Sequence, residues 1–510
     1  MSRPAIVLIG FMGAGKSTGG RLVANRLRAR MVDTDKVIEK RLGMTLPDYF
    51  AKHGEAAFRE VEEQVVLELL DRSDGDVIAL GGGTLQHRAV REALHRHTVV
   101  WIHVGLPTAW RRVKRSKRPL ARDRKAFNRL YRERQELYEQ VADVMLPEAD
   151  RQQLVAATPW IQRVPDAHGA KMLWAHTDSG GYPVWLRPGL LRELPPWPLD
   201  DDSRRIAITD ETVAEHHAGR IPALAGMIEI PPGEAHKTLA TCERVWGSLV
   251  AQGVTRSDHV VAIGGGVVGD LAGFVAATFQ RGVPVVQVPT TLVAQVDSAY
   301  GGKTGVDLPA AKNYVGAYHQ PAAVMVDPDT LETLPAVELA AGYAEVVKTA
   351  LIAGGPLWHQ VSAGGPVDPT TILRCARTKL QTVADDERDG GRRQVLNLGH
   401  TVGHAIETVT DYRRYRHGEA VGLGLLAALR LSGRDALHAQ VSGLLSSAGL
   451  PVTMDPSIDV DEVHAATARD KKRLGTGDVP FVVVHEPGDV RHGKQLRASD
   501  VRAAIAELSA

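Results

Sequence analysis

Two glycine-rich signatures, about 250 residues apart, constrain this chain more than any other feature. The first follows an apolar run at 5–9 and reads Gly-Phe-Met-Gly-Ala-Gly-Lys-Ser-Thr over residues 10–18, which is a P-loop pattern. The second follows an apolar run at 259–263, reads Gly-Gly-Gly-Val-Val-Gly-Asp over 264–270, and leads into the helix-like run 271–279. A strand, a tight glycine turn and a helix N-terminus together form a cradle for phosphate groups. The chain therefore predicts two α/β units with two active sites.

Length and composition narrow the class of protein. The 510 residues are too many for one core and suggest roughly three domains. A net charge of +1 gives neither a nucleic-acid footprint nor an acidic tail at the level of the whole chain. Cys242 and Cys375 are the only cysteines, too few for a disulfide framework. Without a signal-peptide pattern or an apolar run that spans a bilayer, the sequence predicts a cytoplasmic protein that binds small molecules, neither membrane nor nucleic acid.

Apolar periodicity divides the chain into four parts. Residues 1–150 alternate strands with helices and predict a parallel-sheet α/β domain, whereas 151–178 hold only a short helical signal and predict a linker. Residues 179–335 return to an α/β pattern typical of a Rossmann-like subdomain, and residues 336–510 predict a mainly helical subdomain. Strands are predicted at 5–9, 31–33, 77–80, 98–103, 205–209, 260–263, 285–288 and 479–484, and helices at 337–351, 370–384, 401–408 and 419–431.

The first glycine loop predicts a kinase with ATP as co-substrate. In this pattern backbone N–H groups surround the phosphates, Lys16 reaches the outer ones and Ser17 holds Mg²⁺. Asp33 and Asp35 end a predicted strand and point the same way, which offers one carboxylate to Mg²⁺ and one to an acceptor hydroxyl. The predicted nucleotide-binding residues of the loop are Gly13, Ala14, Gly15, Lys16, Ser17 and Thr18.

Several short motifs in residues 1–150 together resemble shikimate kinase. They are Gly13-x-Gly15-Lys16-Ser17-Thr18, Asp33-x-Asp35, Phe58-Arg59-x-x-Glu62, Gly81-Gly82-Gly83 and Arg118-Pro119-Leu120. The resemblance implies that Asp33 and Ser17 serve Mg²⁺, that Arg111 flanks adenine, and that Lys16, Asp35 and Arg118 act in catalysis. It implies that shikimate is held by Asp35, Arg59, Gly82, Gly83 and Arg134. Gly19-Gly20 departs from the family, which more often has a β-branched residue first.

A basic stretch in the first part of the chain raises the alternative of nucleic-acid binding. Residues 111–134 hold twelve Lys and Arg residues. Nucleic-acid binding would call for aromatic side chains interleaved with the charges on an open face. This stretch lies where a kinase lid closes over ATP, so we favour the kinase, with most of these charges forming a solvated helix face.

The second half holds a set of lysines, histidines and carboxylates that suits an anionic substrate and a metal. Lysines among glycines and hydroxyls occur at Gly301-Gly302-Lys303-Thr304-Gly305 and at Lys312-Asn313. Glu345, Lys348, His400, His404 and His417 follow in the helical part. Two histidines and one carboxylate make a catalytic zinc sphere, and the four-residue spacing alone favours His400 and His404 as the ligand pair.

These motifs, in this order from about residue 182 to the C-terminus, resemble 3-dehydroquinate synthase. The resemblance implies that Glu345, His400 and His417 bind zinc or cobalt, so that His404 faces the substrate instead. It implies catalytic roles for Lys303, Lys348, Arg393, Asn397 and His404. Asp389 stands where the family usually has Glu, which shortens that contact by about one methylene.

The resemblance also implies the two binding sets. The substrate would be bound by Lys303, Lys312, Asn313, Lys348, Lys379, Arg393, Asn397, His404 and one or both of Lys471 and Lys472. NAD would be bound by Asp210, Glu234, Lys237, Gly265, Gly266, Val267, Val268, Gly269, Asp270, Thr290, Thr291, Asp297, Lys303, Lys312, Thr330, Leu331, Glu332 and Thr333.

The implied reaction converts 3-deoxy-D-arabino-heptulosonate 7-phosphate into 3-dehydroquinate with release of phosphate, and recycles NAD within each turnover. Two alternatives stay open at this point: a metal-dependent alcohol dehydrogenase of the glycerol-dehydrogenase kind, and a half that serves as a non-catalytic scaffold. The resemblance also implies a homodimer through the synthase half.

Overall fold

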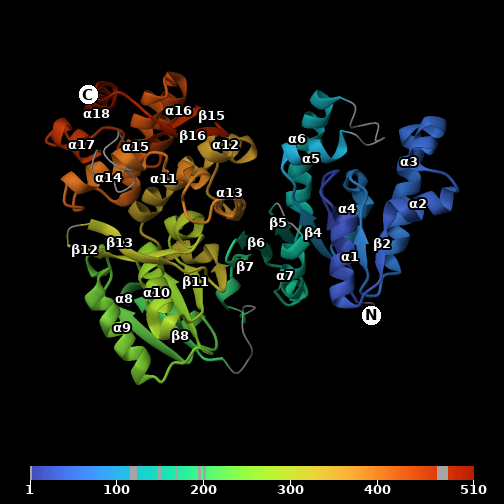
Figure 1. The fold of residues 1–510 in the computed structure, drawn as a ribbon, viewed down its shortest axis with the longest axis horizontal. Coiled ribbons are helices and arrows are strands. Elements are labelled where there is room, and N and C mark those ends of the chain that lie inside the picture. Colours follow the sequence, from blue (N-terminus) through green and yellow to red (C-terminus); the bar gives the residue numbers. More distant parts are fainter. Residues whose placement is uncertain are drawn as a thin grey trace. The chain divides into compact units, whose positions relative to one another are not determined.

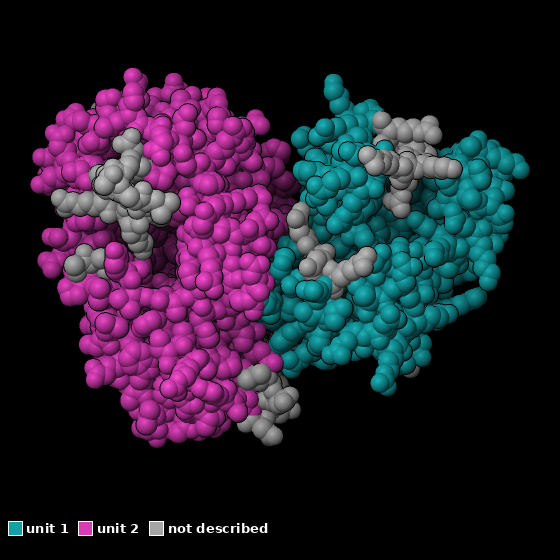
Figure 2. Space-filling view, in the orientation of Figure 1, with its two compact units in different colours: residues 1–176, 180–185 teal, residues 177–179, 186–510 magenta. Residues whose placement is uncertain are grey.

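The computed structural model describes residues 3–114, 123–147, 151–167, 169–192, 197–198, 203–309, 311–467 and 480–509. The chain forms two compact units, coloured separately in Figure 2. Unit 1 comprises residues 1–176 and 180–185, and unit 2 comprises residues 177–179 and 186–510. Both combine strands and helices, so the predicted α/β class is confirmed.

Unit 1 is built on a parallel sheet whose strands are buried. The strand order is β2-β3-β1-β4-β5-β6-β7, and every pairing from β2 to β6 is parallel. Strands covered on both faces are apolar throughout, as in the Thr-Val-Val-Trp-Ile run of β4. The strands are β1 (Ile6–Ile9), β2 (Met31–Asp33), β3 (Val77–Ala79), β4 (Thr98–Ile102), β5 (Val144–Leu146), β6 (Lys171–Thr177) and β7 (Gly180–Leu186).

Helices of unit 1 connect these strands. They are α1 (Lys16–Leu27), α2 (Thr34–Leu42), α3 (Leu46–Asp71), α4 (Arg88–Leu94), α5 (Leu106–Val113), α6 (Arg124–Val141) and α7 (Arg151–Ile161). The segment 151–178, predicted as a linker, contains both α7 and β6. Leu154 of α7 is buried, and a Cβ on Gly19 of α1 would lie 2.8 Å from its Cδ1 atom. Gly19 therefore lets α7 pack closely on the helix that follows the P-loop.

The main-sheet strands of unit 2 are parallel and follow the order β14-β11-β10-β8-β9. Its core gathers Val260, Ala262, Leu271 and Val285 from the central strands and α10. Two antiparallel hairpins, β12–β13 and β15–β16, lie outside this sheet. The strands are β8 (Arg205–Asp210), β9 (Gly226–Ile230), β10 (His259–Gly264), β11 (Val285–Pro289), β12 (Lys303–Leu308), β13 (Ala311–Tyr318), β14 (Ala323–Val326), β15 (Phe481–Glu486) and β16 (Asp489–Lys494).

The second part of unit 2 is helical, as predicted (Figure 1). The helices of the unit are α8 (Glu211–His217), α9 (Leu239–Ala251), α10 (Gly266–Thr278), α11 (Ala336–Ala353), α12 (Gly355–Ser362), α13 (Pro369–Asp385), α14 (His400–Val409), α15 (His417–Leu431), α16 (Asp435–Ser447), α17 (Val460–Thr467) and α18 (Ala498–Ala506). Nearly every position from Gly418 to Leu429 in α15 is buried, because this helix packs against α11, α14, α16 and α18. None of the helices in the described part of the chain has the length and apolar character needed to cross a membrane.

Glycine permits the close approach of α14 and α15. A Cβ on Gly424 would lie 1.9 Å from the carbonyl oxygen of Gly399, directly before His400. Both contacting groups are backbone, so neither has a side-chain torsion that could relieve the clash.

We expect Gly424→Ala to lower the free energy of unfolding of unit 2 by about 1–3 kcal/mol, because overpacking forces the two helices apart. Gly443→Ala in α16 is the matched control, since a Cβ there meets nothing within 4 Å. That control is expected to be neutral, or more stable by up to about 1 kcal/mol through helix propensity. Urea denaturation of the full chain measures both, and equal effects at the two positions would contradict the packing argument.

Candidate active sites

The P-loop joins β1 to α1 through a glycine-dependent turn. Gly10, Gly13 and Gly15 have φ values of 145°, 84° and 88°, which side-chain-bearing residues rarely adopt. The Lys16 ammonium donates to the carbonyl oxygens of Gly10 at 2.8 Å and Phe11 at 3.3 Å. The loop thus curls around Lys16 at the N-terminus of α1, where partial positive charge favours anions.

Two predicted substrate-binding arginines of unit 1 come from different helices and meet at one glycine turn. Arg134 of α6 is buried and donates from Nη1 to the carbonyl oxygen of Gly82 at 2.7 Å. Arg59 of α3 lies against Gly83, where a Cβ would be 2.5 Å from Nη1 of the arginine. Buried Glu62 accepts a hydrogen bond from Arg59 Nη1 at 2.5 Å. Gly83 leaves room for the Arg59 guanidinium, and two arginines at one turn suit a carboxylate.

The other predicted kinase residues come from several elements of unit 1. Asp35 lies in the first turn of α2, directly after β2, and a Cβ on Gly81 would lie 3.0 Å from its Oδ1 atom. Asp33 ends β2 and Ser17 lies in the first turn of α1. Arg111 is exposed near the end of α5 and donates to Thr108 Oγ1 at 3.1 Å. Arg118 lies outside the described residues.

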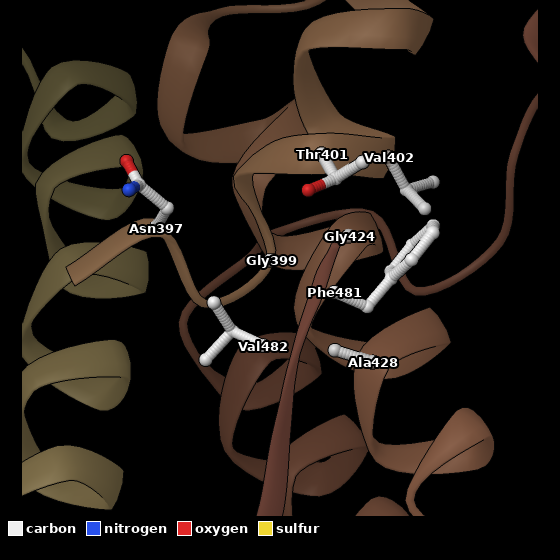
Figure 3. Close-up of a pocket in the computed structure, with 8 residues that line it drawn as sticks. All are labelled: Asn397, Gly399, Thr401, Val402, Gly424, Ala428, Phe481 and Val482. Atoms are coloured by element: carbon white, nitrogen blue, oxygen red, sulfur yellow. The ribbon is translucent and has the colours of Figure 1, made fainter. Parts of the chain in front are cut away.

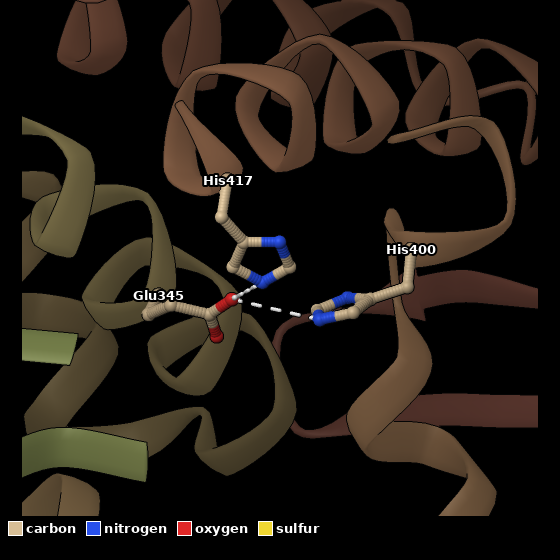
Figure 4. Close-up of side chains that lie close together, drawn as sticks. All are labelled: Glu345, His400 and His417. Atoms are coloured by element: carbon tan, nitrogen blue, oxygen red, sulfur yellow. Dashed lines mark ion pairs between the residues drawn. The ribbon is translucent and has the colours of Figure 1, made fainter. Parts of the chain in front are cut away.

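Three side chains from three helices of unit 2 converge as a candidate metal centre (Figure 4). Oε1 of Glu345 in α11 lies 3.6 Å from Nε2 of His400 in α14 and 3.5 Å from Nε2 of His417 in α15. Their ligand atoms all lie within 4.8 Å of one another. The site is assembled where the first residues of α14 and α15 face the middle of α11.

In both histidines the Nδ1 atom, which points away from Glu345, contacts another group that orients the ring. His400 Nδ1 lies 3.1 Å from the carbonyl oxygen of Leu398, and His417 Nδ1 lies 3.4 Å from both carboxylate oxygens of buried Glu407. Each ring therefore turns Nε2 toward Glu345. Burial alone would lower the pKa of His417, but the carboxylates of Glu345 and Glu407 raise it to about 10.

The residues fit a metal by the chemistry of their donors. Glu345 is buried; its Oε2 atom pairs with the Lys348 ammonium, and its Oε1 atom faces the Nε2 atoms of both histidines. A bound cation would be stabilised by Oε1 and the two Nε2 atoms together. Two imidazole nitrogens and one carboxylate oxygen are donors typical of catalytic zinc.

A second trio, His404, Glu407 and His417, also places its ligand atoms within 4.8 Å of one another. His404 and His400, the pair favoured by spacing alone, have ring centroids 5.2 Å apart. The sequence analysis missed Glu407. Its position three residues after His404 and seven after His400, on one face of α14, is the signal that points to it.

A buried charge network adjoins the metal centre. The Lys348 ammonium lies 2.9 Å from Asp297 Oδ2 and also pairs with Glu345. Lys379 of α13 pairs with the other carboxylate oxygen of Asp297. Burial opposes the ionised form of Asp297, but the two ammonium groups hold its pKa well below the usual range. Lys348 has a raised pKa despite its burial, because Asp297 and Glu345 favour its charged form.

Two further cations predicted to bind substrate belong to the same region of unit 2. The Lys303 ammonium lies 2.5 Å from Oδ2 of Asp389, a residue with a left-handed φ of 61°. The Arg393 guanidinium is buried and donates to the carbonyl oxygens of Gly301, at 3.0 Å, and Glu387. The structure thus connects the β12 hairpin with the segment that precedes α14.

The second glycine loop leads into α10, with Gly265 as N-cap and Asp270 in the helix. A Cβ on Gly265 would lie 2.8 Å from Thr291 Cγ2, so the loop and the turn after β11 pack closely. The Lys237 ammonium contacts Asp270 Oδ2 at 2.6 Å and Asn313 Oδ1 at 2.5 Å. Four residues predicted to bind NAD therefore lie close together in unit 2: Gly265, Thr291, Lys237 and Asp270. Asn313 contacts Lys237 at the same place.

Other predicted NAD residues have structural partners. Asp210 ends β8 and accepts from the backbone N–H of Val213 at 2.9 Å. Thr290 Oγ1 is buried without a hydrogen-bond partner among the described residues. Thr333 Oγ1 lies 2.9 Å from His217 Nε2. Thr330, Leu331, Glu332 and Thr333 belong to one 3-10 helix, Pro328–Thr333.

Asn397 lies on a small cavity beside the metal centre (Figure 3). Gly399 and Thr401 flank His400 and line it too, while Phe481 and Val482 of β15 form another wall. Gly424 of α15 borders the cavity too. Lys471 and Lys472, also predicted to bind substrate, lie outside the described residues.

Known protein families match the first and second parts of the chain separately. The family description "3-dehydroquinate synthase N-terminal" matches residues 227–341, and its C-terminal counterpart matches residues 342–473. A 3-dehydroquinate synthase from Halorhodospira halophila is 42% identical over 335 residues, 62% of this chain and 93% of that protein. The chain belongs to the 3-dehydroquinate synthase family. A synthase from Caulobacter vibrioides is 40% identical over 359 residues, 64% of this chain and 96% of that protein.

The first part of the chain matches the shikimate kinase family over residues 12–164. The chain thus joins a shikimate kinase domain to a 3-dehydroquinate synthase, and both resemblances expected from the sequence are confirmed.

Solved structures support the fold of the synthase half. A 2-epi-5-epi-valiolone synthase from Streptomyces hygroscopicus, with NAD⁺ and Zn²⁺ bound, has a TM-score of 0.59 at 27% identity and covers 64% of this chain and 96% of its own. A 2-deoxy-scyllo-inosose synthase has a TM-score of 0.58 at 24% identity, covering 66% of this chain and 99% of its own.

We expect Glu407→Gln to weaken zinc binding by about 10- to 100-fold, because the neutral amide no longer supports His417 through Nδ1. Glu338→Gln is the matched control, since Glu338 of α11 is exposed and pairs only with Arg416 among the contacts described. Competition with a fluorescent zinc chelator measures both affinities. Wild-type affinity in Glu407→Gln would show that this carboxylate does not support the metal ligand.

Proposed function

We propose that each half catalyses its family's reaction through the residues described above. The kinase half transfers the γ-phosphoryl group of ATP to the 3-hydroxyl of shikimate. The synthase half converts 3-deoxy-D-arabino-heptulosonate 7-phosphate into 3-dehydroquinate and phosphate. The observation that carries the synthase assignment is the Glu345, His400 and His417 trio beside the buried lysines.

In the kinase half, positioning and charge provide the catalysis. Lys16 and the loop amides hold the nucleotide phosphates, and Ser17 with Asp33 serves Mg²⁺. Arg59 and Arg134 would receive the shikimate carboxylate at the Gly82-Gly83 turn; the contact of Arg134 with Gly82 and of Arg59 with Gly83 supports this role. Asp35 orients the acceptor hydroxyl. Arg111 serves the adenine side, and Arg118 is proposed to act on the transferring phosphoryl group.

In the synthase half, Glu345, His400 and His417 would hold zinc, and the same donors also suit cobalt. When bound, zinc polarises the oxygen of the substrate's C5 alcohol and NAD⁺ supplies the hydride acceptor. The 2-epi-5-epi-valiolone synthase with NAD⁺ and Zn²⁺ bound supports this pair of cofactors. NAD would lie along the second glycine loop, with its pyrophosphate at the N-terminus of α10.

The chain's own side chains would bind and orient the substrate. Lys348 keeps its proton, because Asp297 and Glu345 stabilise the ammonium. Lys303 and Arg393 add positive charge for the phosphate and carboxylate, and Asn397 and His404 supply further polar groups. Lys379, Asn313 and one or both of Lys471 and Lys472 complete the proposed set. Pre-oriented charges of this kind stabilise developing negative charge with little reorganisation.

The comparisons disfavour the alternatives. Relatives that share 40–42% identity over 93–96% of their length are synthases, and the buried lysines suit an anionic substrate better than a simple alcohol. A dehydrogenase would produce NADH in proportion to product. A scaffold would not need a buried carboxylate that faces two imidazole nitrogens.

We also propose a cellular compartment, an oligomeric state and a division of the chain into functional parts. We place it in the cytoplasm, where ATP and NAD are available and where two unpaired, buried cysteines remain reduced. We propose a homodimer formed through the synthase half. We propose that residues 1–150 hold the kinase site, that 179–335 form the NAD-binding part and that 336–510 form the zinc- and substrate-binding part; residues 151–178, predicted as a linker, instead contain α7 and β6.

We expect the purified chain to release phosphate from 3-deoxy-D-arabino-heptulosonate 7-phosphate with catalytic amounts of NAD⁺ and without net NADH. Metal removal by a chelator should abolish the release, and added zinc should restore it, because zinc polarises the reacting alcohol. A phosphate assay and absorbance at the NADH band follow the two products. Stoichiometric NADH, or release that persists after complete metal removal, would contradict the assignment.

We expect Arg134→Met to raise the KM for shikimate by about 10- to 100-fold, since a hydrogen bond to a charged group contributes about 1.5–3 kcal/mol. The KM for ATP should stay close to the wild-type value. Arg132→Met, an exposed position on the same helix, is the matched control. Coupled ADP-release kinetics measure both constants, and an unchanged KM for shikimate in Arg134→Met would remove this arginine from the site.

A further inference from the structure

Tyr412, in the connection between α14 and α15, covers a lysine of the synthase site. The Lys312 ammonium of β13 lies 4.1 Å from the centroid of the Tyr412 ring. A cation over an aromatic face at this distance is attracted by the ring quadrupole. Both residues belong to unit 2, but Lys312 comes from the α/β part and Tyr412 from the helical part.

The backbone at this point is strained in a way that places the ring. Asp411 and Tyr412 are consecutive residues with left-handed φ values of 51° and 57°. Residues other than glycine adopt this conformation at a cost, and such strain clusters at functional sites. The Tyr412 hydroxyl lies 3.2 Å from Thr408 Oγ1, which donates to the carbonyl oxygen of His404 at 2.7 Å. The ring is thus tied to α14, the helix that carries His400 and His404.

Among the described residues, Lys312 forms an ion pair with one carboxylate, that of Glu234. Its ammonium lies 3.2 Å from Glu234 Oε1, and the next residue, Asn313, contacts Lys237 at 2.5 Å. Asn313 also has a left-handed φ, of 51°. The ring takes one side of the ammonium and Glu234 takes another, while an ammonium carries three N–H donors. Donors therefore remain for an anionic ligand group.

We propose that Tyr412 is a positioning residue that holds Lys312 toward an anionic oxygen, either of the phosphorylated substrate or of the NAD pyrophosphate. This inference rests on the proposed synthase function. A lysine side chain loses considerable rotamer freedom when a ligand immobilises it. The ring removes part of that freedom in advance, and it does so from the helical part, so that Lys312 is held only while the two parts of the synthase are together.

The kinetic test compares Tyr412→Leu with Tyr412→Phe. We expect the leucine variant to raise the KM for the phosphorylated substrate or for NAD⁺ about three- to tenfold, and the phenylalanine variant, which keeps the ring, to stay within about twofold. The KM that rises identifies the ligand. In a Lys312→Met background, Tyr412→Leu should add less than about twofold, because its effect passes through the lysine. Tyr314→Leu, an exposed tyrosine of β13, is the matched control.

A second readout does not need turnover. Acetylation of the free enzyme by a limiting amine-reactive reagent, followed by mass spectrometry, should modify Lys312 faster in Tyr412→Leu than in the wild type or Tyr412→Phe. The reactivity of exposed Lys494 should be the same in all three. A wild-type chain that releases no phosphate would count against the proposed function, whereas this labelling still tests the contact.

Three results would overturn the inference. They are unchanged KM values in Tyr412→Leu, an equal defect in Tyr412→Phe, and a Tyr412→Leu effect that persists in full without Lys312. Equal Lys312 labelling in the wild type and Tyr412→Leu would overturn it independently of the kinetics.

Discussion

The synthase half depends on charge that is buried before any ligand arrives. Glu345 and Asp297 are carboxylates in the interior, and Lys348 and Lys379 are the cations beside them. Removing such groups from water is expensive, and their mutual attraction repays the cost only with good geometry. The helices α11, α13, α14 and α15 fix that geometry, and close glycine contacts such as Gly424 on Gly399 let them approach. Close helix packing in this half therefore fixes the positions of the buried charges as well as burying apolar side chains.

The kinase half also orients its charged groups before ligands bind, but these groups are less buried. Its phosphate cradle consists of backbone, which glycine torsions shape, and its carboxylate receptor consists of two arginines that meet at another glycine turn. Arg59 and Arg134 are held by Glu62 and by a carbonyl oxygen, so both are oriented in the free protein. In both halves one glycine makes room for a charged side chain: Gly83 for Arg59, and Gly301 for Arg393, whose Nη2 atom would lie 2.6 Å from a Cβ there.

The elements that could be predicted from the sequence are those set by neighbouring residues or by a repeating apolar pattern. The strand, turn and helix around each glycine loop occur where they were predicted, because apolar periodicity and glycine turns act over a few residues. The helical segments from 336 to 431 were also recovered. By contrast, α7 and β6 lie in a segment predicted as a linker, since their burial depends on partners such as Gly19 that are distant in sequence. Glu407 and Tyr412 were missed for the same reason: what marks them is a contact with His417 or Lys312, which no spacing rule contains.

The contact between Gly19 and Leu154 has a consequence for the origin of the joined chain. Leu154 fills the space that a side chain at position 19 would occupy, at the place where the kinase family more often has a β-branched residue. α7 lies in unit 1 and within the shikimate kinase match, so it is part of the kinase and packs on the helix behind the P-loop. Separating the two enzymes before α7 would uncover a groove along α1, so a kinase freed in this way would need a larger residue at position 19 to recover its packing.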